Sequence, residues 1–371
     1  MKNNYQICKK CIMDTSDKTI QFDETGVCNY CKAAEQAIQQ EGYRGKISDE
    51  HLQQMIHKIK DSQKGQEYDC VIGVSGGVDS AYLLYMAHNW GLRVLAVHVD
   101  AGWNSNTAVS NIHKLCEKLN IDLKTVVVDW NIMKEVQRAY MFSGLPNLDV
   151  PQDHVFFAAL YDYANKYKIK YVLTGGNVAT ESILPAYLVY SALDYKCLKD
   201  VYKKNGRGKK LKNYPHLPYL KMRRYLRKLE ILRPLDDLDY SKTKAMVVLE
   251  KEFGWEYYGG KHWESRFTKF LQGVYLPQKF GFNKSRAHLS NLVVNGEITR
   301  EEALQQLEME KELYPLEEQQ RDTDYILKKL EISAEEWRRI MDAPIKTEDD
   351  YKNDKKRAAL FKEIKKCFLR K

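Results

Sequence analysis

Ser75-Gly76-Gly77-Val78-Asp79-Ser80 directly follows the apolar run of residues 70–74 and directly precedes a segment of helical character, residues 81–87. A strand that leads through a glycine turn into a helix forms a cradle for anions. Two adjacent glycines let the main chain approach a phosphate closely, and the unpaired amides at the helix start add partial positive charge. The stretch therefore predicts a nucleotide site.

The spacing excludes the common P-loop, because GxxxxGK[ST] requires a lysine beside the hydroxyl residue and this chain has Asp79-Ser80 there. The stretch instead resembles the SGGxDS signature of the PP-loop, or ATP pyrophosphatase, superfamily. That resemblance implies that ATP is split between its α and β phosphates and that AMP activates an oxygen as a leaving group. The alternative is an ordinary glycine turn that closes a β-α unit. The strand-turn-helix context favours the nucleotide site.

The composition is that of a globular protein. The chain has 371 residues, of which 44% are hydrophobic and 11% aromatic, enough for roughly two or three compact units. It contains no run near the about 18 apolar residues of a membrane helix, and its N-terminus lacks the apolar core of a secretory signal. We therefore expect a cytoplasmic protein without membrane insertion. The net charge of +9 is compatible with RNA, a nucleotide-linked substrate or an anionic surface, and it does not choose among them.

Four cysteines near the N-terminus form two CxxC pairs, Cys8 with Cys11 and Cys28 with Cys31, separated by sixteen residues. This spacing is typical of zinc ribbons and zinc knuckles. In a reducing cytosol, four thiolates this close favour a tetrahedral metal over two disulfides, so we predict Zn²⁺; a degenerate or iron-binding site is the alternative. The isolated Cys70 and Cys116 are expected to be small core residues.

From Asp69 onward, apolar strands alternate with helices, which predicts an α/β fold with a doubly wound parallel sheet. Strands are expected at residues 70–74, 94–99, 123–128 and 171–174, and helices at 78–90, 107–119 and 153–167. We divide the chain into a four-cysteine zinc-binding module (1–45), a helical connector (46–66), a PP-loop ATP-binding α/β domain (67–245) and a mostly helical C-terminal region (246–371) whose first part contributes to the substrate site.

Ligands of such sheets gather at the carboxyl ends of the strands. The strand ends here carry Asp100, Asp129 and the run Gly175-Gly176-Asn177. We interpret Asp129 as the N-cap of the next helix and residues 175–181 as a second wall of the nucleotide site. The basic, tyrosine-rich stretch 196–228 fits either an RNA surface or a solvated insertion with a flexible tip, and we favour the insertion.

The stretch of residues 254–267 mixes aromatic, acidic and basic side chains. Stacking, hydrogen bonding and charge pairing are all available in it, which suits a sugar or base ligand that carries phosphates. Its candidate site residues are Lys261, His262, Glu264 and Arg266. The alternative is a helix start packed on the nucleotide domain, with Trp263 and Phe267 as its buried stripe. Both interpretations are compatible, because the four charged residues would face elsewhere.

Taken together, the two CxxC pairs, SGGVDS, the Thr174–Asn177 strand end and residues 258–265 resemble one family, the N-acetyl sugar amidotransferases of the WbpG type, which act in bacterial surface-polysaccharide biosynthesis. The resemblance extends over nearly the whole chain and is weakest in the basic stretch and the last 60 or so residues. It implies conversion of an acetamido group on a nucleotide-linked N-acetyl sugar into an acetamidino group for lipopolysaccharide or O-antigen biosynthesis.

The resemblance also implies roles for individual residues. The ATP pyrophosphate, with Mg²⁺ offsetting its charge, would be bound by Ser75, Gly76, Gly77, Asp79 and Ser80. The same pocket would include Gly175, Gly176 and Asn177, and Asp100 would contact the nucleoside. Asp79 and the group Lys261, His262, Glu264 and Arg266 would act on the acceptor sugar and on the AMP leaving group.

The chain has no cysteine in a glutaminase-like context, so we expect ammonia to come from solution or from another chain. By resemblance, the partner would be a glutaminase like that of histidine biosynthesis, with its barrel-shaped companion. The rival hypothesis is a tRNA-modifying PP-loop enzyme, a thiolase or lysidine-type ligase, in which the basic stretch binds phosphates. A thiolase requires a reactive cysteine near the nucleotide, and only Cys197 is a candidate. We therefore expect no nucleic-acid partner.

Overall fold

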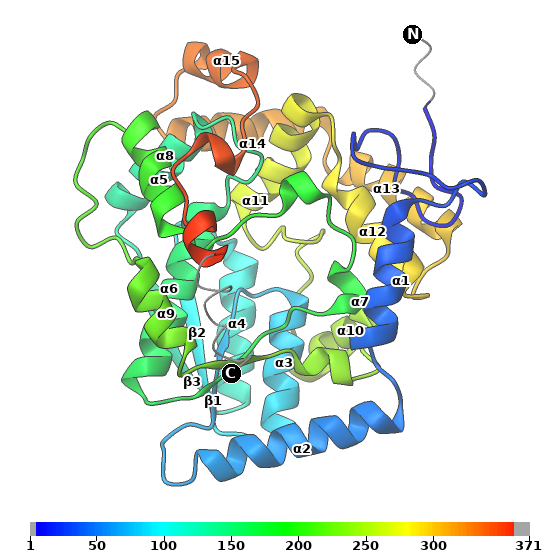
Figure 1. The fold of residues 1–371 in the computed structure, drawn as a ribbon, viewed down its shortest axis with the longest axis vertical. Helices are drawn as coiled ribbons and strands as arrows, with labels where there is room; N and C mark the ends of the chain where they lie inside the picture. Colours follow the sequence, from blue (N-terminus) through cyan, green and yellow to red (C-terminus); the bar gives the residue numbers. More distant parts are fainter. Residues whose placement is uncertain (1–4, 360–371) are drawn as a thin grey trace.

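The computed structural model describes residues 5–359 and, within them, contains one five-stranded parallel sheet (Figure 1). Its strands are β1 (Cys70–Gly73), β2 (Val94–Asp100), β3 (Asp122–Val127), β4 (Tyr171–Leu173) and β5 (Glu230–Leu232). They lie in the order β3-β2-β1-β4-β5. From β1 the chain adds β2 and then β3 on one side. It then returns, and β4 pairs with the other side of β1, so the strand order reverses between β1 and β4. Such a switch point is where open α/β sheets bind ligands.

Helices cover both faces of the sheet, as the predicted doubly wound fold requires. Cys70 and Ile72 of β1 point into a core shared with α2 (Lys46–Ser62), α3 (Val78–Asn89), α4 (Asn106–Lys118) and α10 (Lys242–Phe253). Val71 points the other way, into a core shared with α6 (Val150–Lys166). The alternation follows from the period of two in a strand, and apolar side chains on both faces are typical of a buried parallel sheet. The fold-class prediction is confirmed.

The cysteine module, residues 5–31, lies beside helices of the C-terminal region. It leads into α1 (Asn29–Glu41), which packs on α7 (Val178–Glu181) and α12 (Lys284–Val294). The break between α1 and α2 falls at Gly42 and Gly45. Figure 1 shows the module in dark blue at the side of the molecule and α2 across the bottom of the view.

The basic stretch is folded rather than solvated, so the predicted insertion is wrong except at its tip. It contains α8 (Tyr195–Asn205) and α9 (Tyr219–Leu226), and α8 packs on α5 (Trp130–Met141). Leu198, Tyr214 and Leu217 are buried, while residues 207–210 are exposed. Tyr202 and Tyr214 are therefore core residues of this layer, whereas Tyr225 is only partly buried. Asp129 accepts a hydrogen bond from the Asn131 amide and caps α5, as predicted.

The described part of the C-terminal region is helical, as predicted, and residues 360–371 of the prediction lie outside the described range. It contains α11 (Arg266–Phe270), a π-helical segment (Leu271–Phe280), α13 (Arg300–Leu313), α14 (Leu316–Lys329) and α15 (Ala334–Asp342). Phe267 is fully buried with its ring 4.9 Å from that of Trp103, so this helix start packs on the sheet domain. Within residues 5–359, no helix is long and apolar enough to cross a membrane.

Candidate active site

The loop between β1 and α3 has the geometry of an anion cradle. Gly76 has a φ of +85°, in the left-handed region, and a Cβ atom there would lie 2.8 Å from the carbonyl oxygen of Ala108. Only glycine fits this position. The Ser75 hydroxyl accepts a hydrogen bond from the Gly77 amide at 3.2 Å and lies 3.3 Å from the Ser80 hydroxyl. α3 begins at the next residue, so its unpaired amides face the loop.

The end of β4 lies directly against this helix start. A Cβ atom on Gly175 would lie 2.9 Å from the main-chain carbonyl carbon of Asp79, so the close approach of the two segments requires glycine. Asn177 is fully buried, accepts a hydrogen bond from the Thr180 amide at 2.9 Å and donates one to the carbonyl of Gly175 at 3.0 Å. Asn177 therefore caps α7 and holds the strand end in place.

A cavity of about 550 Å³ lies between the loop, the end of β4 and the C-terminal region. The structure brings together on its walls most of the sequence-predicted site residues: Ser75, Gly77, Asp79, Ser80, Gly175, Gly176, Lys261, His262 and Glu264. The segment that holds the last three is joined to the sheet domain, because the Ser105 amide donates to the carbonyl of Glu264 at 2.7 Å. The predicted phosphate side and the predicted acceptor side thus face one space.

Four predicted residues do not line this cavity. Gly76 and Asn177 shape the loops after β1 and β4, and other residues of these two loops line the cavity. Asp100 accepts a hydrogen bond from the Gly102 amide at 2.7 Å and so turns the chain after β2. Arg266 is separated from its predicted group, because it pairs with Asp322 at 2.7 Å and its guanidinium lies 3.7 Å from the ring centroid of Tyr325. The helix turn at Ser265 directs Arg266 away from the cavity.

Asp79 and Lys242 place charge beside the loop. Tyr240 is buried and donates a hydrogen bond to the Asp79 carboxylate, which fixes this side chain within the first turn of α3. Burial, followed by the Asp79 charge, raises the pKa of Tyr240 well above its usual value. Lys242 lines the cavity from the start of α10, and burial, followed by the charge of Lys261, lowers its pKa. An ammonium held in this way is suited to a phosphate, whose charge would add to that of the nearby Asp79 and Glu264.

Glu264 and His262 form a second pair on the cavity wall, with 3.5 Å between Nδ1 of His262 and Oε1 of Glu264. Burial alone raises the pKa of Glu264, but the hydrogen bond and charge of His262 outweigh it, so this pKa lies below its usual value. Oε2 of Glu264 is buried and has no hydrogen-bond partner among the described residues. His262 has a φ of +67°, a strained conformation that clusters at functional sites. The carboxylate is therefore poised for a ligand.

Sequence reasoning missed a third group on the far wall, where Lys284 and His288 of α12 face Asp149 and Asp153 of the α6 start. Burial lowers the pKa of Lys284 and lowers that of His288 far below its usual value. Burial, followed by the Asp153 charge, raises the pKa of Asp149 to about 7. The Asp149 carboxylate accepts a hydrogen bond from Thr268 at 3.1 Å. This wall thus presents a lysine, a histidine whose neutral form is favoured, and carboxylates that can accept protons.

The sequence carried a signal for the two missed lysines. Lys242 and Lys284 are the first residues of their helices, directly after the N-caps Ser241 and Asn283. A cation in the first turn opposes the helix dipole, so it is a candidate contact for an anionic ligand, but Lys46, Arg266 and Arg300 also begin helices and do not line the cavity. No comparable local signal marks His288 or Asp149.

The four cysteines of the N-terminal module come together as predicted. Their sulfur atoms all lie within 4.8 Å of one another and are buried. Three of the separations are 3.6, 3.7 and 3.8 Å. A tetrahedral ion with sulfur ligands at about 2.3 Å requires edges of about 3.8 Å. The donor set and spacing therefore fit a Zn²⁺ ion.

Two family models match parts of the chain. The model described as "LPS biosynthesis protein WbpG-like, C-terminal domain" matches residues 264–365, and the model described as "Queuosine biosynthesis protein QueC" matches residues 69–186. The first match contains Glu264 and α12, and the second contains the glycine loop and the end of β4. The two matched regions thus both contribute residues to the walls of the cavity.

Curated relatives match over parts of their length. The tRNA-specific 2-thiouridylase MnmA 2 of Fusobacterium nucleatum is 30% identical over 35% of this chain and 40% of that protein. The NH3-dependent NAD+ synthetase of Methanococcoides burtonii is 29% identical over 36% of this chain and 52% of that protein. The chain therefore spans about half or less of the length of these relatives.

Two solved structures align with lower identity. The NMN synthetase from Francisella tularensis is 20% identical, with a TM-score of 0.34 over 56% of this chain and 71% of that chain. The NH3-dependent NAD synthetase from Campylobacter jejuni is 15% identical, with a TM-score of 0.35 over 68% of this chain and 97% of that chain.

The parallel sheet, the SGGVDS loop at its switch point and the sequence matches define a protein of the PP-loop, or ATP pyrophosphatase, superfamily. Within that superfamily, the C-terminal part of the chain is similar to the C-terminal domain of WbpG-like proteins.

Proposed function

We propose that this protein is an ATP-dependent amidotransferase that converts the acetamido group of a nucleotide-linked N-acetyl sugar into an acetamidino group. The observation that carries the proposal is the shared cavity. The glycine loop, suited to ATP phosphates, and the WbpG-like C-terminal region, which supplies Glu264, Lys284 and His288, line one space of about 550 Å³. A nucleotide and an acceptor bound on these two sides would meet.

The chemistry explains why both reactants are needed. An amide carbon is a poor electrophile. The acetamido oxygen therefore attacks the α phosphorus of ATP, the bond to pyrophosphate breaks, and an O-adenylyl imidate forms. Ammonia then forms a new C–N bond, the C–O bond breaks, and AMP leaves with the electron pair. One proton is lost from the attacking nitrogen, and the product is a cationic amidinium.

The cavity residues suit the charges that develop during the proposed reaction. The loop amides and Lys242 would bind the pyrophosphate leaving group, because preorganised donors stabilise charge that develops there. Asp79 and the unpartnered oxygen of Glu264 are ligands of the kind that Mg²⁺ prefers, and a bound Mg²⁺ would offset the phosphate charge. Asp149 and Asp153 would accept the released proton and stabilise the amidinium cation.

The four-cysteine cluster and the source of ammonia lie outside the cavity. Zn²⁺ bound to the four cysteines would have a structural role, because the cluster is buried away from the lining residues. We place the enzyme in the cytoplasm, in lipopolysaccharide or O-antigen biosynthesis. Its ammonia would come from a glutaminase of the histidine-biosynthesis type that acts with a barrel-shaped companion.

Pyrophosphate release tests the proposal. The purified protein, supplied with ATP, Mg²⁺ and ammonium chloride, is assayed over a panel of nucleotide-linked N-acetyl sugars. We expect release with at least one of these sugars and none with the matching sugar that has a free amine. Release that is indifferent to every sugar would contradict the proposal.

The rival function, modification of tRNA, has support from the printed name of one relative but not from the cavity. Among the described residues, no cysteine lines the cavity of the glycine loop. Cys197, the only thiol considered for a thiolase, is buried elsewhere, and burial raises its pKa to about 12. Adding tRNA to the same assay separates the two hypotheses, because stimulation by tRNA without sugar would favour the rival.

A further inference from the structure

A second cavity, of about 430 Å³, lies next to the first and has no part in the function described so far. Its inner part is formed by apolar side chains, Tyr140, Leu145 and Val150, all buried. Its outer part is formed by the segment around Ser191 and by residues 345–355, which we call the C-terminal strap. The cavity therefore leads from a polar rim to an apolar interior.

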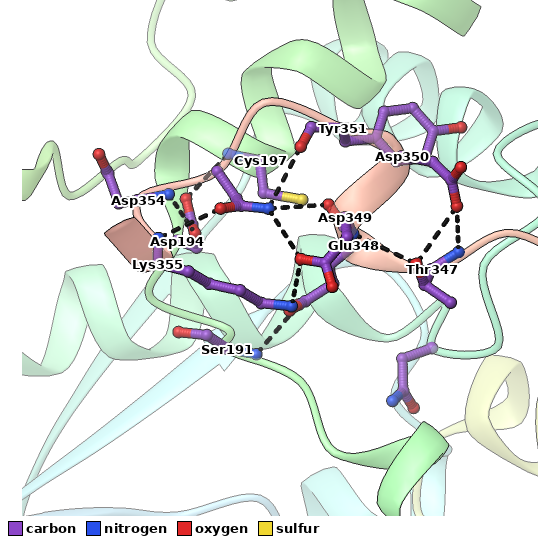
Figure 2. Close-up of polar contacts among 12 residues, drawn as sticks. Ser191, Asp194, Cys197, Thr347, Glu348, Asp349, Asp350, Tyr351, Asp354 and Lys355 are labelled. Carbon is purple, nitrogen blue, oxygen red and sulfur yellow. Dashed lines mark hydrogen bonds and ion pairs between the residues drawn. The ribbon is translucent and has the colours of Figure 1, made fainter. Parts of the chain in front are cut away.

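Polar contacts hold the rim in a defined shape (Figure 2). Asp194 accepts hydrogen bonds from the Cys197 amide at 2.9 Å and from the Asp354 amide at 2.8 Å, and so joins α8 to the strap. The Ser191 amide donates to Glu348 at 3.2 Å. Lys355 lies 2.9 Å from Asp349 and 3.4 Å from Glu348. The carboxylates of Asp194, Glu348 and Asp349 at the rim therefore already have partners within the chain. These side chains surround the mouth of the cavity and do not fill it.

The two cavities share a thin wall. Tyr190 lines both, and its hydroxyl donates a hydrogen bond to Asp153 on the side of the first cavity. Val150 lines the second cavity, while its neighbour Asp149 lines the first. A molecule that crosses this wall therefore arrives at the two carboxylates opposite Lys284.

The proposed function requires a third reactant at a moment when the first cavity is full. ATP and the acceptor sugar occupy that cavity, and the imidate must be shielded from water until a nitrogen nucleophile reaches it. A separate path through an apolar space meets both requirements. Neutral ammonia crosses such a space readily, whereas ammonium and phosphates pay a large desolvation cost there.

We propose that the second cavity is the access route of ammonia to the reacting carbon, with Tyr190 and Val150 as its inner end. This inference rests on the proposed function and adds the path of its nucleophile. Ammonia passes the wall, its lone pair forms the C–N bond, AMP leaves with the C–O electron pair, and one nitrogen proton passes to Asp149 or Asp153. A pKa near neutrality, as burial gives Asp149, suits a group that accepts this proton.

Plugging the rim tests the route. Ala186 and Ser191 are exposed and line the second cavity, so Ala186→Trp and Ser191→Trp would narrow its mouth without altering the core. We expect each to raise KM for ammonium chloride by about tenfold or more and to leave KM for ATP unchanged. Val127→Trp, at a residue of β3 that is 72% exposed, is the matched control and should change neither constant. An unchanged KM for ammonium in both plugged variants would overturn the route.

A second measurement separates this result from the proposed function. Exchange of labelled pyrophosphate into ATP, in the presence of the acceptor sugar but without ammonia, reports adenylation alone. We expect the plugged variants to exchange at the wild-type rate, which also shows that they are folded. Absence of sugar-dependent exchange in the wild-type protein would overturn the proposed function and, with it, the route. Normal exchange with normal ammonium kinetics in the plugged variants would overturn the route alone.

Discussion

The Nε–H group of Arg300 donates a hydrogen bond that is shared between the carbonyl oxygens of Cys8 and Cys11, at 3.1 Å to each. Arg300 is the first residue of α13. Arg286 of the neighbouring α12 pairs with Asp14 at 3.0 Å. Because α12 also carries Lys284 and His288 into the cavity, the cysteine module supports this wall of the candidate active site.

Loss of the metal should therefore destabilise more than the module itself. We expect Cys28→Ser to abolish metal binding and to lower Tm by at least about 5 °C, because metal binding drives the folding of such modules. Metal analysis and thermal unfolding measure the two effects. Cys116→Ser, at a buried cysteine of α4, is the control and should retain the metal. A Cys28→Ser protein with wild-type Tm would show that the cluster supports nothing.

Gly76 and Gly254 allow a matched test of the loop geometry. Both have positive φ values, +85° and +61°, but only a Cβ atom on Gly76 would meet another atom, the Ala108 carbonyl oxygen at 2.8 Å. Each alanine substitution should cost about 1 kcal/mol for the left-handed backbone. Gly76→Ala should cost more in urea unfolding and should also impair ATP binding. Equal effects of the two substitutions would show that the loop does not require this close approach.

Lys242 and Lys244 test whether the buried ammonium serves ATP. They lie two residues apart at the start of α10, but Lys242 lines the cavity, whereas the side chain of Lys244 is 72% exposed. We expect Lys242→Ala to raise KM for ATP by about tenfold or more and Lys244→Ala to change it by less than about twofold. Steady-state pyrophosphate release provides both values. A wild-type KM for ATP in the Lys242→Ala variant would show that Lys242 does not bind the phosphates of ATP.

Asp149 should make stability depend on pH in a defined window. Its pKa is raised to about 7 in the folded protein, from about 3.9 in an unfolded chain. The folded state thus holds a proton that the unfolded state has lost, and the contribution of Asp149 to stability decreases as pH rises from about 4 to about 7. Asp149→Asn should remove this slope, up to about 1.4 kcal/mol per pH unit. Urea unfolding across this window measures it, with the exposed Asp61→Asn as control. An unchanged slope would contradict the raised pKa.

The sequence predicted the strands and helix ends that depend only on residues close to one another in the chain. The apolar strands around residues 70–74 and 94–99 and the helix N-cap at Asp129 all occur where they were expected. The edge strand β5 was not predicted, and of helix α5 only its start at Asp129 was. β5 has three residues, of which Ile231 is 45% exposed, so no apolar run marks it.

The site residues could be predicted where they lie close together in one sequence motif. They could not be predicted where they come from elements that are distant in the sequence. The glycine loop and the four cysteines act at short spacing, and both assemble as expected. Asp149 and His288 are 139 positions apart in the sequence and meet only because α6 and α12 pack around one cavity. Arg266 was grouped with Lys261 by proximity in sequence, but the helix turn after Ser265 directs it to Asp322 instead.

The oxygen of the acetamido group offers the most direct test of the central claim, that AMP is transferred to this atom. A nucleotide-linked N-acetyl sugar labelled with ¹⁸O in its acetamido carbonyl is incubated with the enzyme, ATP, Mg²⁺ and ammonium chloride. The AMP produced is then analysed by mass spectrometry. Because AMP leaves with the former acetamido oxygen, we predict that the label appears in AMP in step with amidine formation. Unlabelled AMP, with the ¹⁸O retained in the sugar product, would contradict it.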